Sequence, residues 1–275
     1  AIVAIRIAYL GRPDPPPIAV ERWLVWGYFG LSGVSLWFVP LGASAWALEA
    51  SGLTPDLLGA AAVLAALLGA VAAGIPWRPL SIRRCEIVID GLPPAFDGFT
   101  IAQLTDLHAG PMCPGWWITG WARAAMALKP DLIAITGDLV ASGPDFVPDL
   151  ERAFRALKAP SGVFAVMGNH DYFGGADPAL LAMFERLGTT VLRNRAVTLQ
   201  RGEDSLAIAG VDDTWRGLAD VRAAVGDIAA GTTTVLLAHD PAVFEESCAE
   251  SVALQISGHV HGGQIAVPWL GAAGS

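Results

Sequence analysis

Charge is scarce in this chain, and positive charge is the scarcer kind. Only 16% of the 275 residues are charged, and 17 basic residues stand against 26 acidic ones, for a formal net charge of −9. Lysine occurs only at Lys129 and Lys158, and no basic run is present. Nucleic-acid binding needs clustered positive charge that neutralises phosphates, so we expect no nucleic-acid-binding surface.

Cysteine is also rare, which argues against a disulfide-stabilised scaffold. The three cysteines, Cys85, Cys113 and Cys248, are odd in number and far apart in the sequence. This usage fits a reducing compartment. Cys113 follows His108 by five residues, and we interpret it as a small buried residue rather than a metal ligand.

Histidine is limited to five residues, and each lies in a short motif of ligand-type residues. The motifs, with a Gly-Asp pair among them, are Asp106-Leu107-His108, Gly137-Asp138, Gly168-Asn169-His170-Asp171, Ala238-His239-Asp240 and Gly258-His259-Val260-His261. Histidine is the commonest metal ligand in proteins. Because the chain has no other histidine, we predict that all five serve one site.

Two long apolar runs occupy the N-terminal part of the chain. Residues 23–48 form a run of 26 positions without a charge, and residues 57–77 form one of 21, whereas about 20 residues suffice for a helix to cross the hydrocarbon core. Arginines flank the outer ends of the two runs, and the link between them has none. The positive-inside rule therefore predicts an N-terminal segment over 1–22, then a transmembrane helical hairpin over 23–78 in a bacterial inner (cytoplasmic) membrane, with the catalytic part in the cytoplasm. A signal peptide and a pair of buried helices are the alternatives.

The remaining residues, 84–275, have the pattern of an α/β domain. Apolar runs alternate with helical patterns, and five runs end directly before the polar motifs. The predicted strands cover residues 99–104, 131–136, 162–167, 205–211, 233–238 and 252–257. In open α/β sheets, binding sites form at the carboxyl ends of strands, so we expect the motifs to meet at one edge.

The donor atoms in these motifs suit a pair of divalent metal ions. Seven Asp, Asn and His ligands are too many for one tetrahedral site, and they suit two metals that share a bridging carboxylate. Mixed nitrogen and oxygen donors accept Mn, Fe, Zn or Ni, so the metal identity stays open. Such a pair of cations clamps a phosphoryl oxygen and activates a hydroxide that attacks phosphorus. The sequence therefore predicts phosphoester hydrolysis.

Together, the five motifs resemble the signature of the calcineurin-like metallophosphoesterase family: D-x-H, G-D, G-N-H-[DE], a lone His and G-H-x-H, in this order. The resemblance covers roughly residues 84–267, and the blocks Gly210-Val211-Asp212-Asp213 and Gly262-Gly263-Gln264 look like the bacterial, membrane-associated branch. It implies a four-layer α/β/β/α sandwich. Family members continue with further strands after the last motif, whereas this chain ends at Ser275, which predicts a truncated C-terminus.

The resemblance also implies roles for individual residues. Asp106, His108 and His261 would bind the first metal, Asn169, His239 and His259 would bind the second, and Asp138 would bridge the two. His170, paired with Asp171, would contact the phosphate and protonate the leaving group. Two other pairs are interpreted as structural: Asp212 and Asp213 as turn or loop residues rather than ligands, and Arg193 and Arg195 as a solvated loop pair.

The sequence leads to three functional hypotheses. The first is a membrane-anchored dimetal phosphohydrolase that cleaves a phosphodiester or pyrophosphate on a lipid-linked substrate such as UDP-diacylglucosamine. The second is a phosphodiesterase or phosphatase for soluble or cell-envelope substrates, with the helices as a tether. The third is a non-catalytic metal-binding scaffold. Such scaffolds typically lose ligand residues, whereas every ligand of the signature is present here.

Overall fold

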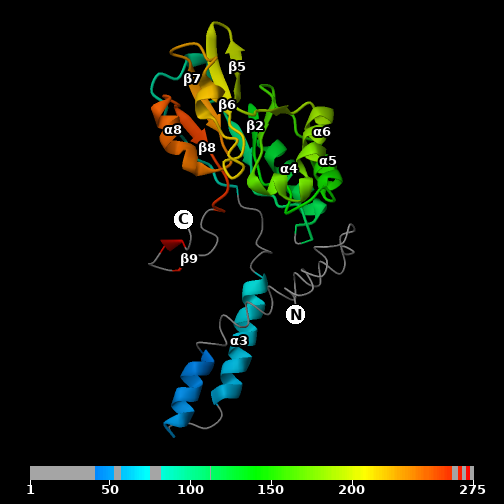
Figure 1. Cartoon of the computed structure of the whole chain (residues 1–275), viewed down its shortest axis with the longest axis vertical. Helices are drawn as coiled ribbons and strands as arrows, with labels where there is room; N and C mark the ends of the chain where they lie inside the picture. The colour runs from blue at the N-terminus through cyan, green and yellow to red at the C-terminus, as the bar shows by residue number, and fades with distance from the viewer. Residues whose placement is uncertain are drawn as a thin grey trace. The chain divides into compact units, whose positions relative to one another are not determined.

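A computed structural model describes the protein over residues 41–52, 57–74, 82–111, 113–261, 266–267 and 271–272 (Figure 1). The chain divides into two compact units, residues 1–84 and 85–275. The second unit contains every histidine motif.

The first unit is helical where it is described. Residues 41–50 form one helix, and α3 (Leu57–Gly74) is an apolar helix of 18 residues. Over the described residues, no helix is both long and apolar enough to cross a membrane, since the hydrocarbon core takes about 20 helical residues. The predicted transmembrane hairpin over 23–78 is therefore not found there, and residues 23–40 of its first helix lie outside the described segments.

The first sheet of the second unit has four parallel strands in the order β1-β2-β3-β4. The strands are β1 (Ile101–Leu104), β2 (Leu132–Thr136), β3 (Val163–Val166) and β4 (Thr190–Val191), and the helices between them are α4 (Gly115–Ala127), α5 (Val147–Phe154) and α6 (Asp177–Leu187). All five residues of β2 are buried, as expected for a central parallel strand that is covered on both faces.

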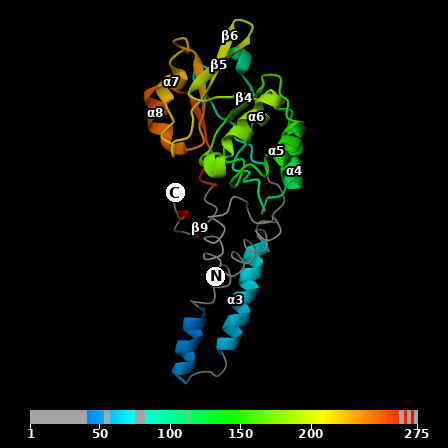
Figure 2. The same ribbon diagram turned by 45° about the vertical axis from the view of Figure 1, so that its right-hand side comes forward.

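The second sheet has the order β5-β6-β7-β8, and β6, β7 and β8 are parallel. Its strands are β5 (Arg195–Arg201), β6 (Asp204–Gly210), β7 (Thr233–Leu237) and β8 (Leu254–Ile256), with the helices α7 (Val221–Val225) and α8 (Phe244–Ala249) beside it (Figure 2). β5 and β6 form an antiparallel hairpin. The short strands β9 (Ala266–Val267) and β10 (Gly271–Ala272) pair only with each other.

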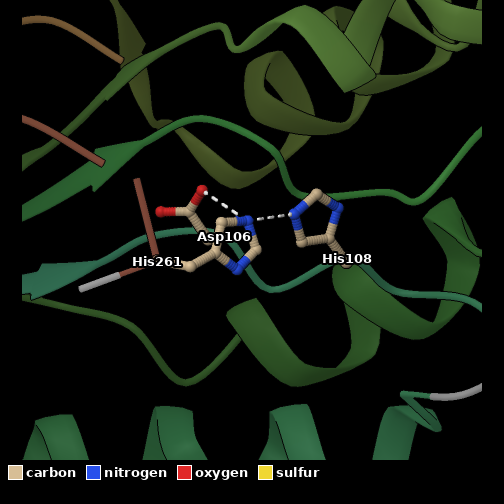
Figure 3. Close-up of side chains that lie close together, drawn as sticks. All are labelled: Asp106, His108 and His261. Atoms are coloured by element: carbon tan, nitrogen blue, oxygen red, sulfur yellow. Dashed lines mark hydrogen bonds and ion pairs between the residues drawn. The ribbon is translucent and has the colours of Figure 1, made fainter. Parts of the chain in front are cut away.

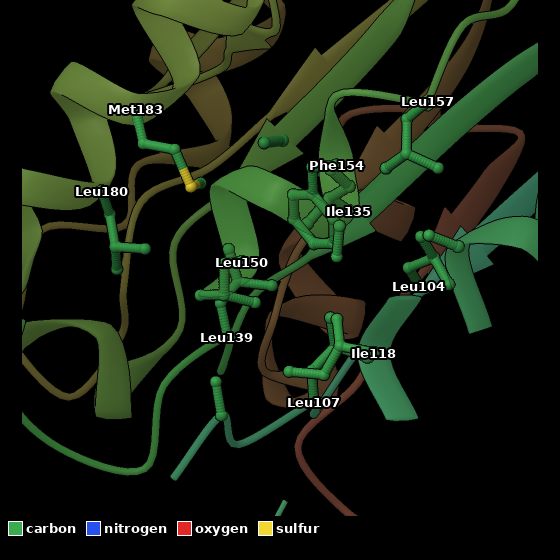
Figure 4. Close-up of a cluster of buried hydrophobic side chains, with 14 of the residues drawn as sticks. Leu104, Leu107, Ile118, Ile135, Leu139, Leu150, Phe154, Leu157, Leu180 and Met183 are labelled. Atoms are coloured by element: carbon green, nitrogen blue, oxygen red, sulfur yellow. The ribbon is translucent and has the colours of Figure 1, made fainter. Parts of the chain in front are cut away.

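Three buried clusters show how these elements are layered. Alternate residues of β2 point to opposite faces: Ile133 and Ile135 pack with α4, α5 and α6 (Figure 4), whereas Leu132 and Ala134 pack against the second sheet. The third cluster joins Ala209 of β6 and Leu236 of β7 to α7. Helices thus cover the outer face of each sheet, and the two sheets pack on one another. The predicted α/β fold with parallel sheets is confirmed, and the strand ends of both sheets carry the histidine motifs.

Candidate metal centre

Five strand ends deliver the predicted ligands. Asp106 and His108 follow β1, Asp138 follows β2, Asn169 follows β3, His239 follows β7, and His259 and His261 follow β8. β1, β2 and β3 are parallel in the first sheet, and β7 and β8 are parallel in the second, so the carboxyl ends meet at one edge of each sheet. The 2.8 Å contact between His239 Nδ1 and the carbonyl oxygen of Thr136 joins the two edges. The segments that leave these strands converge there.

The backbone at the ligands is held in an unusual conformation. Among the described residues, eight non-glycine residues have a positive φ, and five of them are predicted ligands: Asp106 (52°), His108 (44°), Asp138 (55°), His259 (71°) and His261 (51°). Such left-handed conformations are sparsely populated and cost about 1–3 kcal/mol each. Strain of this kind concentrates at functional sites, where the surrounding structure over-determines it.

The first cluster consists of Asp106, His108 and His261, whose donor atoms lie within 4.8 Å of one another. His261 Nε2 lies 3.5 Å from Asp106 Oδ1 and 3.1 Å from His108 Nε2 (Figure 3). The Asp106 carboxylate is fixed by the backbone N–H of His259, at 3.0 and 3.1 Å from its two oxygens, and by the hydroxyl of Thr105 at 2.7 Å. A carboxylate and two imidazoles that converge in this way are a suitable donor set for a divalent cation.

The second cluster consists of Asp138, His239 and His259. The Nδ1–H of His239 donates a hydrogen bond to the carbonyl oxygen of Thr136 at 2.8 Å. The lone pair of Nε2 is therefore available to coordinate a metal ion. This Nε2 lies 3.3 Å from Asp138 Oδ2 and 3.2 Å from His259 Nδ1. Asp138 Oδ2 is also 3.7 Å from His108 Nε2. One carboxylate oxygen therefore adjoins both clusters, as a bridging ligand does.

The hydrogen bonding of the Asn169 side chain indicates whether a metal ion would fit this site. Its side chain is buried, and its Oδ1 has no hydrogen-bond partner among the residues that the structure describes. A buried amide oxygen without a partner costs about 1–3 kcal/mol, and a divalent cation would satisfy it. The unpartnered oxygen and the two clusters fit the predicted dimetal centre.

Three glycines permit the close packing of the ligands. A Cβ atom on Gly168 would lie 2.3 Å from Asp138 Oδ1, and one on Gly258 would lie 2.5 Å from Asp106 Oδ2. A Cβ atom on Gly137 would lie 2.9 Å from His239 Nδ1. Contacts under 3.0 Å essentially never occur for Cβ atoms. The motif glycines therefore allow the ligands to approach the backbone closely.

His170 lies beside both clusters. Its Nδ1 is 2.8 Å from the carbonyl oxygen of Ala141, and its backbone N–H donates to Asp138 Oδ1 at 2.9 Å. A ring nitrogen of His170 lies within 4.8 Å of the donor atoms of His108 and Asp138. The Phe173 ring packs against the imidazole with a centroid distance of 4.7 Å. The side chain is thus held in place next to the metal ligands.

Asp171 does not pair with the His170 imidazole, contrary to the prediction. Its fully buried carboxylate accepts hydrogen bonds from four backbone N–H groups, those of Asp138, Leu139, Val140 and Gly168, at 2.9, 2.7, 3.3 and 2.9 Å. Burial raises the pKa of Asp171 to about 7, against the opposite effect of these backbone donors. Asp171 therefore fixes the loop that carries Asp138, whereas a carbonyl group orients His170.

The two clusters differ in their electrostatics. Burial lowers the pKa of His108 to about 4, although the charge of Asp138 opposes this shift. Burial also disfavours a charged His239, but the hydrogen bond and the charge of Asp138 raise its pKa to about 9. The same contact with His239 outweighs burial and holds the pKa of Asp138 below its usual range. Asp138 is therefore ionised at neutral pH, as a bridging ligand must be.

Asp212 and Asp213 lie in the loop after β6, in agreement with the prediction, whereas the interpretation of Arg193 and Arg195 is corrected. Asp212 and Asp213 are 5% and 1% exposed. The Asp212 carboxylate accepts hydrogen bonds from the Tyr172 hydroxyl and from Arg193 Nε, so Arg193 is an ion-pair partner rather than a solvated loop residue. Arg195 begins β5 and donates to the carbonyl group of Val191. The contact between Tyr172 and Asp212 joins η3 (Asn169–Gly175) to the end of β6, and no local motif in the sequence signals it.

Known proteins share this domain. Residues 99–263 match the calcineurin-like phosphoesterase family. The uncharacterized metallophosphoesterase YkuE of Bacillus subtilis is 32% identical over 200 residues, which cover 70% of each chain. A bovine transmembrane protein with a metallophosphoesterase domain is 28% identical, over 68% of this chain and 46% of that protein. The UDP-2,3-diacylglucosamine pyrophosphatase LpxG of Chlamydia trachomatis is 24% identical, over 62% of this chain and 66% of that protein.

The family match covers the part of the chain that contains all five strand ends and both ligand clusters. Its members are metal-dependent hydrolases, and the convergent Asp and His groups agree with that chemistry. This chain belongs to the calcineurin-like phosphoesterase family and is a metal-dependent phosphoesterase.

Proposed function

We propose that the protein is a membrane-associated phosphohydrolase with a dinuclear metal centre. The first metal would be held by Asp106, His108 and His261, the second by Asn169, His239 and His259, and Asp138 would contact both. One observation carries this assignment: Asp138 Oδ2 lies 3.7 Å from His108 Nε2 and 3.3 Å from His239 Nε2, so a single oxygen adjoins both ligand clusters. Divalent ions at such a site polarise phosphoryl oxygens and lower the pKa of a bound water.

His170 supplies the proton for the leaving group in this proposal. Its imidazole lies beside the donor atoms of His108 and Asp138, and the contact with the carbonyl oxygen of Ala141 fixes its orientation. A positioned general acid contributes about 10²–10⁴-fold to the rate of such a step. Asp171 acts through the backbone: it holds the loop that presents Asp138.

The proposed substrate is a phosphodiester or pyrophosphate that is linked to a lipid, such as UDP-diacylglucosamine. The apolar runs over 23–48 and 57–77 support a location at the bacterial inner membrane with the catalytic unit in the cytoplasm. The names of two relatives, a transmembrane protein and a UDP-2,3-diacylglucosamine pyrophosphatase, point the same way. An anchored enzyme would meet a lipid-linked substrate in the plane of the membrane.

The second candidate is the same hydrolysis of soluble or cell-envelope phosphodiesters, with the N-terminal unit as a tether. It is supported by the first cluster, in which His108 is only partly buried and His261 is exposed, so that both are open to a soluble substrate. A non-catalytic scaffold is disfavoured because both ligand clusters and His170 are in place.

The role of His170 is tested with the His170→Ala variant of the full chain, loaded with Mn²⁺. We expect kcat for bis(p-nitrophenyl) phosphate to fall about 10²–10⁴-fold, with unchanged metal content. Arg155→Gln is the control, because Arg155 is exposed on the surface and pairs only with Glu151 among the described residues. Undiminished turnover in the His170 variant would remove this residue from the mechanism.

The substrate class is tested with the detergent-solubilised full chain. We compare kcat/KM for UDP-2,3-diacylglucosamine with that for bis(p-nitrophenyl) phosphate, and we expect the lipid substrate to be preferred by about tenfold or more, since an apolar subsite adds binding free energy. Equal or lower efficiency on the lipid substrate would favour the second candidate.

A further inference from the structure

Residues 212–217, named here the platform loop, are fixed at both ends by hydrogen bonds. The backbone N–H of Asp212 donates to Asn194 Oδ1 at 3.0 Å, and the N–H of Arg216 donates to Asp213 Oδ2 at 2.9 Å. The Thr214 hydroxyl donates to Asp240 Oδ2 at 2.6 Å, which ties the loop to the residue after the ligand His239. The loop is therefore rigid although it lies on the surface.

This loop exposes a large apolar side chain, which is costly to leave in water, next to an arginine. Trp215 is 68% exposed, and Arg216 beside it is also exposed. A tryptophan presented on a fixed loop is a common anchor for ligands. Neither side chain contributes to the buried clusters that hold the fold together.

Trp215 lies beside a predicted metal ligand, and Arg216 lies beside the segment that carries His170. The Trp215 ring lies 6.2 Å, centroid to centroid, from the ring of the ligand His259. The Arg216 guanidinium lies 5.5 Å from the centre of the Tyr172 ring, two residues after His170. The loop thus spans the rim of the site from the second ligand cluster to the proposed general acid.

The charge around this rim gives Arg216 a specific use. Buried carboxylates near the rim are those of Asp138, Asp212 and Asp213, of which Asp138 contacts His239 and Asp212 pairs with Arg193. The proposed metal ions would receive the scissile phosphate, whereas a second anionic group would lie at the rim, where Arg216 is the exposed cation of the platform loop. A guanidinium binds phosphate oxygens through paired N–H groups.

We propose that the platform loop is the specificity element of this enzyme. Arg216 binds an anionic group beyond the scissile phosphorus, and Trp215 contacts the flat or acyl apolar group that is attached to it. This inference rests on the proposed phosphohydrolase function, and it adds which chemical groups the enzyme recognises next to the scissile phosphate. The ligand class is an anion linked through a short polyol to a flat or apolar group, either the base of a nucleoside diphosphate or the acyl chains of a phospholipid.

Binding is measured by calorimetry with the Mn²⁺-loaded full chain in detergent. The two probes are α,β-methylene-UDP, which presents a flat base, and dihexanoyl phosphatidic acid, which presents acyl chains. For the probe that binds, we expect Kd to rise about tenfold in Arg216→Gln, because a charge-assisted contact is lost. We expect a rise of about five- to tenfold in Trp215→Ala, from the loss of aromatic contact area. The probe that binds identifies the source of the apolar group.

Two control variants make the result specific. Trp215→Phe should restore most of the affinity, because it keeps an aromatic face, and Arg155→Gln, which removes an exposed arginine on the surface near α5, should bind as the wild type does. Wild-type affinity in both Arg216→Gln and Trp215→Ala, or no binding of either probe, would overturn the proposal. The rate of bis(p-nitrophenyl) phosphate hydrolysis by the same preparations tests the proposed phosphohydrolase function separately. If the wild type hydrolyses this substrate but the loop variants bind the probes normally, only the role of the platform loop is contradicted. If the metal-loaded wild type does not hydrolyse it, the proposed phosphohydrolase function is contradicted.

Discussion

At the scale of single residues, Gly168 is as important to the metal centre as the ligands themselves. A Cβ atom at this position would lie 2.3 Å from Asp138 Oδ1 and 2.5 Å from the backbone nitrogen of Asp138. We predict that Gly168→Ala displaces the bridging carboxylate and lowers kcat/KM by about 100-fold or more, in line with a misplacement of about 1 Å. Metal content by mass spectrometry and steady-state kinetics measure the effect.

A second glycine provides the matched control for this variant. Gly120 lies on the exposed side of α4, and a Cβ atom there would meet nothing within 4 Å. Gly120→Ala should therefore keep full activity and stabilise the fold by up to about 1 kcal/mol. Normal metal content in Gly168→Ala would show that the loop of Asp138 adapts more easily than its packing suggests.

Asp171 gives a prediction about stability. Its two carboxylate oxygens accept four backbone N–H groups in a fully buried site. In Asp171→Asn, an NH₂ group replaces one acceptor and leaves buried donors without a partner, so the free energy of unfolding should fall by about 1–3 kcal/mol. Urea denaturation measures the change. The exposed pair of Asp149 with Arg152 supplies the control, since Asp149→Asn should cost less than about 1 kcal/mol.

At the scale of secondary-structure elements, the strands that carry ligands were predictable, whereas β5, α7 and α8 were not. Residues 132–135 and 235–238 are continuously apolar because β2 and β7 are buried between layers. β5 (Arg195–Arg201) has charged and polar residues and only partly buried or exposed positions, so it carries no apolar run. α7 has five residues and α8 has six, too few for a helical pattern to emerge.

The candidate site was predictable to the extent that its residues are local in the sequence. The ligands could be predicted because each lies in a short motif directly after a strand. The true partners of Asp171, and the contact of Tyr172 with Asp212, depend on how segments distant in the sequence pack together. Spacing along the chain carries no signal for either.

The contact between Tyr172 and Asp212 gives a prediction at this scale, because it joins η3, which follows β3 of the first sheet, to the end of β6 in the second. The side chain of Asp212 also pairs with Arg193. A double-mutant cycle with Tyr172→Phe and Asp212→Asn should yield a coupling free energy of about 1–2 kcal/mol, as expected for a hydrogen bond to a buried charge. Thermal or urea unfolding of the four proteins measures it. Additive effects would mean that the two sheets are held together without this contact.

At the scale of the whole molecule, the metal centre should contribute to the stability of the second unit. It gathers ligands from the ends of strands in both sheets, and five of them have strained backbone conformations. Chelation should therefore lower the melting temperature of the full chain by about 5–10 °C, and Mn²⁺ should restore it, since a ligand that binds only the folded state stabilises it by mass action. Calorimetry with and without chelator measures the shift. A melting temperature that does not respond to metal would mean that the strand ends are stable without the ions.

The central claim is that one carboxylate, that of Asp138, joins two metal sites. The most direct test is the metal content and the hydrolysis of bis(p-nitrophenyl) phosphate by the wild type and by Asp138→Asn, after chelation and re-addition of Mn²⁺. We expect about two ions per chain and metal-dependent turnover in the wild type, with fewer ions and a loss of activity of about 10²–10⁴-fold in the variant. Two ions and normal turnover in Asp138→Asn would contradict it.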